Sequence, residues 1–321
     1  MKVLVVTNMY PTAKTPAVGT FVYDQVSSLR RAGVCIDVLH VNGRDDTWNY
    51  IRGFFRFWRV LSRHKYDLVH AHYVLTGVIA RAQWGLPVVL THHGPEVLGY
   101  PRWQTWLAKL VTPLFDEVIY VSEQMRRALH DDDGWVIPCG IDLDAFARVP
   151  RDEARATLGL PPDKPLVLWA GEHWRPEKRF TLVEQAIASL KQSLPDAELV
   201  LLSRRPHELV PTYMSACDSL VLTSALEGSP MVVKEAMACD LPVVSVQVGD
   251  VPDVIDGTAG CAIVDGEPGQ IALRLADVLR QRERTDGRAR VHRFARDRIA
   301  AAIVDVYRHA INRPRRRHRA T

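Results

Sequence analysis

The amino-acid sequence predicts an α/β protein of two doubly wound, Rossmann-like domains that face each other across a cleft. Short runs rich in Val, Ile and Leu alternate with helix-length patterns along the chain. Near-continuous apolar runs of this kind suit strands buried on both faces of a parallel sheet. The alternation stops near Pro161-Pro162 and then resumes, which indicates a second domain of the same class. Open sheets of this class bind ligands beyond the carboxyl ends of their strands, so we expect the site there.

The elements of the two domains follow from this alternation. We expect strands at 2–8, 35–41, 68–73, 87–93, 117–122 and 135–138, and then at 166–170, 198–203, 220–223, 242–246 and 261–264. Helical patterns cover 20–32, which ends at Gly33, and then 181–193, 210–216, 230–239 and 270–282. We place the domains at 1–148 and 149–290. Residues 291–321 are expected to form a helix, which could cross back to the first domain, and a basic tail with five arginines between Arg313 and Arg319.

The composition is that of a folded protein and excludes several other classes. Of the 321 residues, 47% are hydrophobic and 24% are charged, so we expect disorder only at the ends. The five cysteines are odd in number and form no CxxC pair, which argues against a disulfide framework and a zinc site. No apolar run reaches the length of about 18 residues that a membrane span needs, and the first strand begins too early for a signal peptide. We therefore expect a cytoplasmic protein with reduced thiols.

The segment from Ser224 to Ala238 carries the clearest candidate site. Gly228 permits a tight turn after the preceding strand, Ser229 suits the N-cap, and Pro230 suits the first helical position. Glu227 then lies on the loop and Glu235 on the helix, whose N-terminal amides favour an anion such as a phosphate. This arrangement suggests an enzyme that handles a phosphorylated polar ligand. The same spacing also fits two solvated surface carboxylates.

A basic loop after the first strand of the second domain is the next candidate. Arg175 and Lys178 lie three residues apart and can converge on a diphosphate, the arginine by a fork and the lysine as a point charge. A solvated charge run is the alternative. The sequence contains neither a GxxxxGK[ST] loop nor a GxGxxG motif, which argues against an ATPase and a dinucleotide-dependent dehydrogenase. Nothing in it requires a divalent metal, so we expect no metal and no cofactor.

In the first domain, polar residues at strand ends include several histidines. His70 and His72 lie at the end of one expected strand, and another strand opens directly into His92 and His93. A histidine in this position is more often a hydrogen-bonded structural residue than a catalyst. Gly19 precedes the first helix, where a glycine lets a ligand approach the backbone, although turn chemistry explains it equally well.

The stretch 48–65 interleaves aromatic and basic residues at helical spacing. Four arginines share one face of the expected helix, and apolar side chains lie on the others. This pattern is typical of an interfacial helix that is attracted to anionic lipid, and it fits a domain helix with its apolar face in the core equally well. The arginines are Arg52, Arg56, Arg59 and Arg63.

Taken together, these segments resemble the retaining glycosyltransferases of family 4, which have the two-domain GT-B fold. Residues 227–238, followed by 241–244, look like the EX7E signature of that family and its next strand. The segments 175–180 and 206–213 are similar to a branch related to teichuronic acid biosynthesis. Further matching segments are 91–94, 121–123 and 137–142.

The resemblance implies a role for each candidate residue. The N-terminal domain would hold the acceptor and the C-terminal domain a nucleotide-sugar donor, UDP- or GDP-linked. Arg175 and Lys178 would bind the donor diphosphate, and Glu235 the ribose. His93 would lie near the 6-hydroxyl of the transferred sugar, and Gly19 would let its loop approach the diphosphate and the acceptor. The remaining donor contacts would come from Glu227 and the backbone that follows it, at Gly228, Ser229, Pro230, Met231 and Val232.

The sequence departs from the family pattern at three places. Gly171-Glu172 stands where the family usually has Gly-Arg, and Arg175 is the candidate replacement for that arginine. The stretch between Ser203 and Pro206 is short, which leaves the nucleotide base open. The doubled His92-His93 leaves open which of the two histidines faces the ligand.

The resulting interpretation is a retaining glycosyltransferase of the hexosyltransferase type, which builds a cell-surface polysaccharide or glycoconjugate. Its partners would be a nucleotide sugar, a glycan or lipid-linked acceptor and an anionic membrane surface met through 48–65, with no nucleic acid. We expect it in the cytoplasm, with a peripheral association at the inner face of the plasma membrane. The alternatives are a nucleotide-sugar epimerase and a catalytically inactive GT-B subunit.

Overall fold

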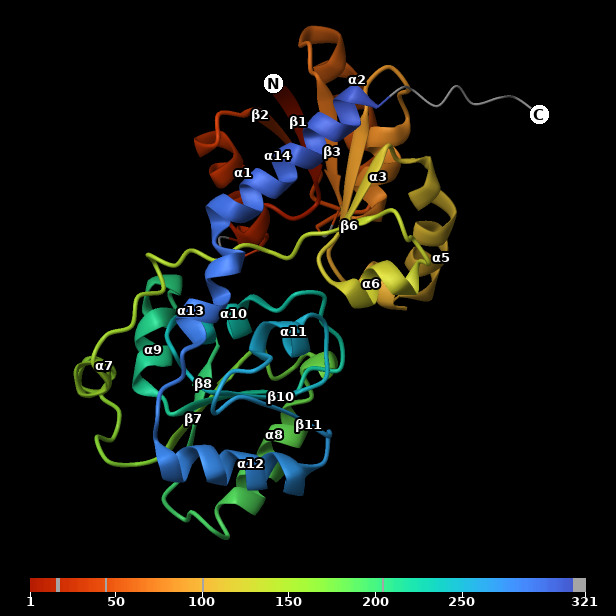
Figure 1. The fold of residues 1–321 in the computed structure, drawn as a ribbon. Coiled ribbons are helices and arrows are strands. Elements are labelled where there is room, and N and C mark those ends of the chain that lie inside the picture. The colour runs from red at the N-terminus through yellow and green to blue at the C-terminus, as the bar shows by residue number, and fades with distance from the viewer. Residues whose placement is uncertain (16–17, 44, 100, 204, 314–321) are drawn as a thin grey trace. The chain divides into compact units, whose positions relative to one another are not determined.

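The chain packs as two units. The computed structural model describes residues 1–15, 18–43, 45–99, 101–203 and 205–313. Unit 1 combines residues 1–140 with the segment that starts at Arg296, and unit 2 consists of residues 141–295 (Figure 1). The chain therefore passes between the units twice. The basic tail expected beyond Arg313 lies outside the described residues.

The first boundary falls at Gly140/Ile141 instead of residue 148, because the segment after it packs into unit 2. Its helix α7 (Arg151–Leu158) lies against α9 (Val210–Ala216). The guanidinium of Arg155 is fully buried and pairs with Asp218 at 2.9 Å. Arginine is rarely buried without such a partner. Ile141 and Phe146, which lie between the observed and the predicted boundary, belong to the core of unit 2 as well.

Unit 1 contains a parallel sheet with the strand order β2-β1-β3-β4-β5-β6. Each strand lies within two residues of its predicted bounds. The strands are β1 (Lys2–Thr7), β2 (Cys35–His40), β3 (Leu68–His72), β4 (Val88–His92), β5 (Glu117–Tyr120) and β6 (Trp135–Val136).

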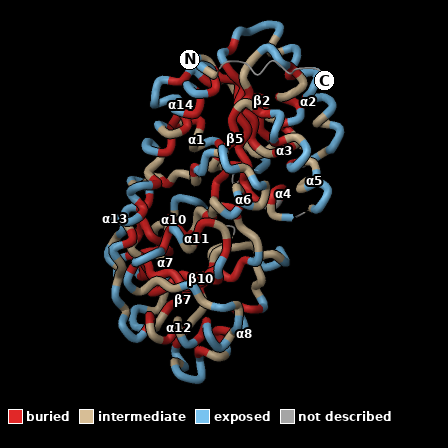
Figure 2. The backbone as a smooth tube through the Cα atoms, turned by 45° about the vertical axis from the view of Figure 1, so that its right-hand side comes forward, coloured by how far each residue is buried: buried red, intermediate tan, exposed pale blue. Residues whose placement is uncertain are grey.

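Helices cover both faces of this sheet because its strands are apolar on both sides. Val3 and Val5 of β1 face the cluster formed with α1 (Thr20–Arg31) and α14 (Arg296–Asn312). Leu4 and Val6 face the opposite cluster, which includes residues of α2 (Trp48–Arg63) and α3 (Val74–Arg81). Figure 2 shows the buried strands between these layers. The other helices of unit 1 are α4 (Pro95–Leu98), α5 (Arg102–Val111), η1 (Thr112–Leu114) and α6 (Glu123–Ala128).

Unit 2 repeats this plan with the strand order β11-β10-β9-β7-β8, again entirely parallel. One face packs against α9, α10 (Met231–Ala238), α11 (Val251–Ile255) and α13 (Gly287–Val291), and the other against α8 (Phe180–Leu190) and α12 (Pro268–Gln281). The two doubly wound sheets confirm the predicted fold class. The strands are β7 (Leu166–Ala170), β8 (Glu198–Leu202), β9 (Ser219–Leu222), β10 (Val243–Val246) and β11 (Ala262–Val264), and the short 3-10 helices are η2 (Pro176–Lys178), η3 (His207–Leu209) and η4 (His292–Phe294).

Helix α1 shows how the sequence fixes these elements locally. Val22, Val26 and Leu29 are spaced to form one buried stripe. The helix then stops because Gly33 has a left-handed φ of +86°, a conformation that glycine adopts at little cost. This end agrees with the predicted one.

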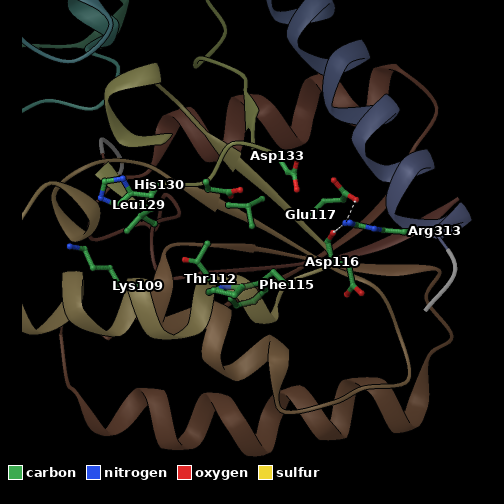
Figure 3. Close-up of a pocket in the computed structure, with 13 residues that line it drawn as sticks. Lys109, Thr112, Phe115, Asp116, Glu117, Leu129, His130, Asp133 and Arg313 are labelled. Carbon is green, nitrogen blue, oxygen red and sulfur yellow. Dashed lines mark hydrogen bonds and ion pairs between the residues drawn. The ribbon is translucent and has the colours of Figure 1, made fainter. Parts of the chain in front are cut away.

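The C-terminal helix α14 is tied to unit 1 by a buried carboxylate at the start of β5. Glu117 accepts hydrogen bonds from Trp135 Nε1 at 2.7 Å, His309 Nδ1 at 2.7 Å and Arg313 Nη1 at 3.0 Å. Figure 3 shows Glu117 and Arg313 beside the pocket that they help to line. Two of these donors come from the last turn of the helix and the residue just after it, so one side chain holds both β6 and the end of α14.

We expect Glu117→Ala to lower the free energy of unfolding by about 1–3 kcal/mol, because three donors lose a shared, buried acceptor. Thermal melting measures the change. The matched control is Asp305→Ala, which removes an exposed ion pair with Arg308 on the same helix and should have an effect near zero. Equal effects of the two substitutions would contradict this role for Glu117.

Candidate active site

In unit 1 the candidate residues lie where β3 and β4 end. The two strands are neighbours, and His72 is paired with Thr91 in their register. His72 is therefore the last residue of β3, and His93 follows the last residue of β4. Parallel strands end at the same edge of a sheet, so the two imidazoles meet there.

The meeting produces a direct hydrogen bond between two histidines. Nδ1 of His72 lies 2.8 Å from Nε2 of His93, and the rings are stacked. One nitrogen must donate and the other accept, so a single proton lies between them. The other ring nitrogens, His72 Nε2 and His93 Nδ1, are buried and have no hydrogen-bond partner within the described chain. His93 therefore has one nitrogen fixed by His72 and one that is unused.

The other histidine of the doubled pair, His92, has different surroundings. His92 Nε2 bonds the hydroxyl of Thr112 at 3.0 Å, and its ring stacks on Tyr120. His93 instead packs against Phe21 of α1 and Tyr73, with ring centroids 5.0 Å and 4.9 Å away. Of the two, His93 is thus the histidine beside the helix that Gly19 precedes.

Burial keeps this histidine group uncharged. It lowers the pKa of His72 to about 3 and lowers the pKa values of His70 and His93 well below the usual value near 6.5. His70 is also fully bonded, to Tyr307 Oη and to Thr91 Oγ1 at 2.7 Å each. His93 therefore offers a neutral hydrogen-bonding group at pH 7.

The backbone conformation and the close packing at Gly19 are enough to require a glycine there. Its φ is +75°, and a Cβ atom at this position would lie 2.3 Å from the carbonyl carbon of Met9. Any larger residue would push α1 away from the loop after β1. This contact neither requires nor excludes the predicted approach of a ligand.

In unit 2, the loops that follow β7 and β9 are held together by two hydrogen bonds to backbone carbonyls. The hydroxyl of Thr223 donates to the carbonyl of Lys178 at 2.9 Å, and the amide of Ala225 donates to the carbonyl of Glu177 at 2.8 Å. This brings two predicted residues together, because Lys178 Nζ lies 2.6 Å from Glu227 Oε1. The pair is partly exposed, so a ligand can reach both charges.

Arg175 lies in the same loop but has another partner. Its Nε donates to Glu177 Oε1 at 2.7 Å. The structure therefore brings Lys178 to Glu227 while the guanidinium of Arg175 pairs within its own loop.

The segment 228–232 begins differently from the prediction. Helix α10 starts at Met231, and no side chain caps it, so Ser229 is not its N-cap. The hydroxyl of Ser229 instead donates to Asp250 Oδ2 at 2.8 Å and accepts from Nζ of the fully buried Lys234, which also donates to Asp250 Oδ2 at 2.7 Å. Pro230 takes the cap position, and Met231 and Val232 open the helix.

The loop at Glu227 is also in close contact with the loop that follows β10. Gly249 has a φ of +55°, and a Cβ there would lie 2.7 Å from the carbonyl oxygen of Gly228. Glycine is thus needed for the loop after β10 to approach Glu227 and Gly228. Glu235 lies one turn into α10 with a largely buried side chain, and Nε2 of His207 is 4.0 Å from its Oε1.

Among the described residues, no three His, Cys, Asp or Glu side chains gather as metal ligands, and the five cysteines are free thiols. Burial raises the pKa of Cys261 to about 11. In the part of the chain that the structure describes, no helix combines the length and the apolar character needed to span a bilayer.

Comparison with known families accounts for both halves of the chain. Residues 2–145 match the model described as Glycosyltransferase Family 4, and residues 200–298 match that of Glycosyl transferases group 1. The chain belongs to the family 4 glycosyltransferases. The solved structure of sucrose-phosphate synthase from Thermosynechococcus elongatus covers 96% of this glycosyltransferase and 98% of that protein, with a TM-score of 0.81 and 22% identity. The structure of HepE from Anabaena in complex with UDP has a TM-score of 0.72 at 18% identity and covers 95% and 99% of the two chains. Both likenesses show the GT-B fold.

Two relatives illustrate the range of the family. TuaC of Bacillus subtilis, provisionally named as a teichuronic acid biosynthesis glycosyltransferase, is 28% identical over 320 residues, which cover 78% of this chain and 82% of TuaC. The D-inositol 3-phosphate glycosyltransferase of Mycobacterium tuberculosis is 30% identical over 319 residues and 82% of this chain. The match spans only 65% of the length of the mycobacterial enzyme.

Sequence reasoning missed three residues of this glycosyltransferase that shape its candidate site. His72 was visible as a histidine at a strand end, but its bond to His93 depends on the register of β3 and β4. Lys234 lies inside the Glu227–Glu235 segment, where a lysine looks like a solvated residue. Asp250 is sixteen positions further along the chain, and only the fold brings it to Lys234.

The buried ion pair of Lys234 and Asp250 yields one prediction. We expect Asp250→Ala to destabilise the protein by about 3–5 kcal/mol, because it leaves a buried ammonium without a partner. The double variant Lys234→Met/Asp250→Leu removes both charges and should recover a large part of that loss. Urea titration measures both, and a double variant less stable than the single one would contradict the explanation.

The neutral histidines yield a second prediction, on pH. In the unfolded chain a histidine binds a proton below about pH 6.5, whereas His72 in the fold does so only near pH 3. Their contribution to stability is therefore complete above pH 6.5 and is lost as the pH falls, by about 1.4 kcal/mol per pH unit for each buried histidine. We expect the melting temperature to fall between pH 6.5 and 5.

The matched variants for this prediction are His72→Asn and His64→Asn. The first should make the pH dependence shallower, and the second, at an exposed histidine after α2, should leave it unchanged. The same slope in wild type and His72→Asn would show that His72 is not held neutral.

Proposed function

We propose that this glycosyltransferase moves a sugar from a UDP- or GDP-linked donor to a glycan or lipid-linked acceptor, with retention of the anomeric configuration. The observation that carries the proposal is the 2.6 Å contact between Lys178 and Glu227 at the strand ends of unit 2. It joins a cation that suits a diphosphate to a carboxylate that suits sugar hydroxyls, and that carboxylate lies in the segment that matches the group 1 model.

Donor binding would redirect both cations of the loop. Lys178 is paired with Glu227, and Arg175 with Glu177, so an entering diphosphate would compete with the two carboxylates. A dianionic group offers more charge than one carboxylate, and bidentate contacts favour arginine. Glu227 would then be released to accept hydrogen bonds from the donor sugar. The cations would also stabilise the negative charge that develops on the leaving diphosphate.

The start of α10 would supply the remaining donor contacts. Because the hydroxyl of Ser229 is committed to Asp250, a donor would bind to the backbone N–H groups of Gly228, Ser229, Met231 and Val232. Glu235, one turn along the helix, would accept hydrogen bonds from ribose hydroxyls. The crystal structures of HepE with UDP and with UDP-glucose support a uridine donor for a protein of this fold.

On the side of unit 1, neutral His93 would accept from or donate to the 6-hydroxyl of the sugar through Nδ1. We assign no protein nucleophile. In front-face transfer, the acceptor oxygen bonds to the anomeric carbon as the bond to the donor phosphate breaks, and the acceptor proton passes to the departing phosphate oxygen. The proposed setting is cell-surface polysaccharide synthesis at the inner face of the plasma membrane. The name of TuaC, which refers to teichuronic acid biosynthesis, supports a biosynthetic role of this kind and does not bear on the location.

Isothermal titration of purified protein with UDP- and GDP-sugars tests the donor site. We expect Lys178→Ala and Glu235→Ala each to weaken donor binding by about tenfold or more, since each removes a charged contact. The control Lys191→Ala removes an exposed lysine at the end of α8 and should bind like wild type.

Wild-type donor affinity in both variants would overturn the assignment. If the donor sugar is converted when no acceptor is present, as NMR would reveal, the protein is an epimerase. If wild type binds none of the nucleotide sugars, it is an inactive GT-B subunit.

A further inference from the structure

Helix α2 of unit 1 packs with one face and exposes aromatic side chains on another. Gly53 and Phe57 are buried against the domain. Trp48 and Phe55 are 64% and 68% exposed, and Ile51, Phe54 and Trp58 are exposed as well. At 100° per residue, these five apolar positions form a continuous face that begins beside the buried one. The helix therefore serves the core and also leaves a large apolar surface in contact with solvent.

Helix α5 presents a second exposed apolar ridge. Trp103, Trp106 and Leu110 are 55%, 66% and 57% exposed, whereas Ala108 is buried. Their spacing of three and four residues places all three on one face, opposite Ala108. A helix that turns its two tryptophans to solvent reverses the usual pattern of a surface helix.

The two ridges belong to one side of unit 1. Helix α3 lies against both α2 and α5, and its exposed Val78, together with Trp84 just beyond it, adds apolar surface between them. Figure 2 shows α2, α3 and α5 following one another on this side. We call this set the aromatic face: Trp48, Ile51, Phe54, Phe55, Trp58, Val78, Trp84, Trp103, Trp106 and Leu110. Exposed apolar patches of this extent mark interaction sites.

The charged residues within the two outer helices of the aromatic face, α2 and α5, have one sign. Neither α2 nor α5 contains an aspartate or a glutamate, and both carry exposed basic residues: Arg52, Arg56, Arg59 and Arg63 on α2, and Arg102 and Lys109 on α5. Asp46 pairs with Arg52 at 3.6 Å. Within the described chain, no carboxylate pairs with Arg56, Arg59 or Arg63.

We propose that the aromatic face is a docking surface for an anionic lipid bilayer, formed jointly by α2, α3 and α5. Tryptophan and phenylalanine beside arginine and lysine suit the headgroup boundary, where apolar side chains enter the acyl region and cations meet anionic headgroups. The proposal deepens the proposed function by locating the acceptor at a membrane surface, and it rests on that function for this point alone. The proposal differs from the expectation of an interfacial helix at 48–65 because α5 contributes to the same surface.

Flotation of the full chain with phosphatidylcholine vesicles, with and without 30–40% phosphatidylglycerol, tests the proposal. We expect flotation with anionic vesicles at low salt, and much less with neutral vesicles or at high salt. Trp103→Ser/Trp106→Ser, with α2 intact, should lower the vesicle-partition constant by about tenfold or more. Arg59→Gln/Arg63→Gln should lower it by about tenfold, and chiefly for anionic vesicles.

Matched controls come from unit 2. Leu273→Ser removes an equally exposed apolar side chain on α12, and Arg274→Gln/Arg280→Gln removes two exposed arginines on the same helix. These variants should float like wild type. All substituted positions are exposed, and circular dichroism of each variant verifies its fold.

Three results would overturn the proposal. The first is wild type that fails to float at low salt, and the second is a Trp103→Ser/Trp106→Ser variant that floats like wild type. The third is a wild-type dimer, seen by ultracentrifugation without lipid, that is absent in the Trp103→Ser/Trp106→Ser variant. That result would make the aromatic face a contact between two copies of the chain. Donor titration and flotation of both kinds of variant separate the two proposals. Lys178→Ala should lose donor binding and float like wild type, whereas Trp103→Ser/Trp106→Ser should bind donor like wild type and lose flotation.

Discussion

All strands of both sheets run parallel to their neighbours, and this constraint determines where the chain can place chemistry. A parallel pair needs a crossover connection, so every strand is followed by a loop at the same edge of its sheet. In unit 1 that edge receives His72 and His93 from adjacent strands, and in unit 2 it receives Lys178 and Glu227 after β7 and β9, which are also adjacent. Residues far apart in sequence thereby become neighbours because their strands are adjacent in the sheet.

The loops at these edges are held from behind by groups that do not face a ligand. Lys234 and Asp250 anchor Ser229, Gly249 permits the next loop to press on Gly228, and Thr223 fastens the loop of Lys178. Burying a lysine is costly unless a carboxylate compensates it, and such pairs are better at fixing one arrangement than at adding stability. A glycosyltransferase must distinguish hydroxyl groups that differ only in direction, and a loop fixed in this way can do so.

Much of this architecture was predictable because it depends on local patterns. Apolar runs located the strands, Gly33 located a helix end, and the Glu227–Glu235 spacing pointed to the segment after β9. The rest depends on pairing across the fold. Ser229 looked like an N-cap because serine often is one, but its hydroxyl oxygen accepts from Lys234 and its hydrogen goes to Asp250. The burial of Arg155 was not predicted, because its partner Asp218 is brought to it only by the packing of α7 on α9. The exposed tryptophans of α5 could not be told from core residues, since periodicity gives a face but not its direction.

The two passages of the chain between its units have a consequence for how the protein is made. Unit 1 is finished by α14, whose Ile303, Val304 and Tyr307 complete one of its two apolar layers. A ribosome delivers that helix after the whole of unit 2, roughly 150 residues later than the sheet of unit 1. At about 5–20 residues per second, the nascent first unit must wait on the order of ten to thirty seconds with one apolar layer uncovered. During that interval the incomplete domain exposes apolar surface of the kind that chaperones protect from aggregation, and α14 covers it.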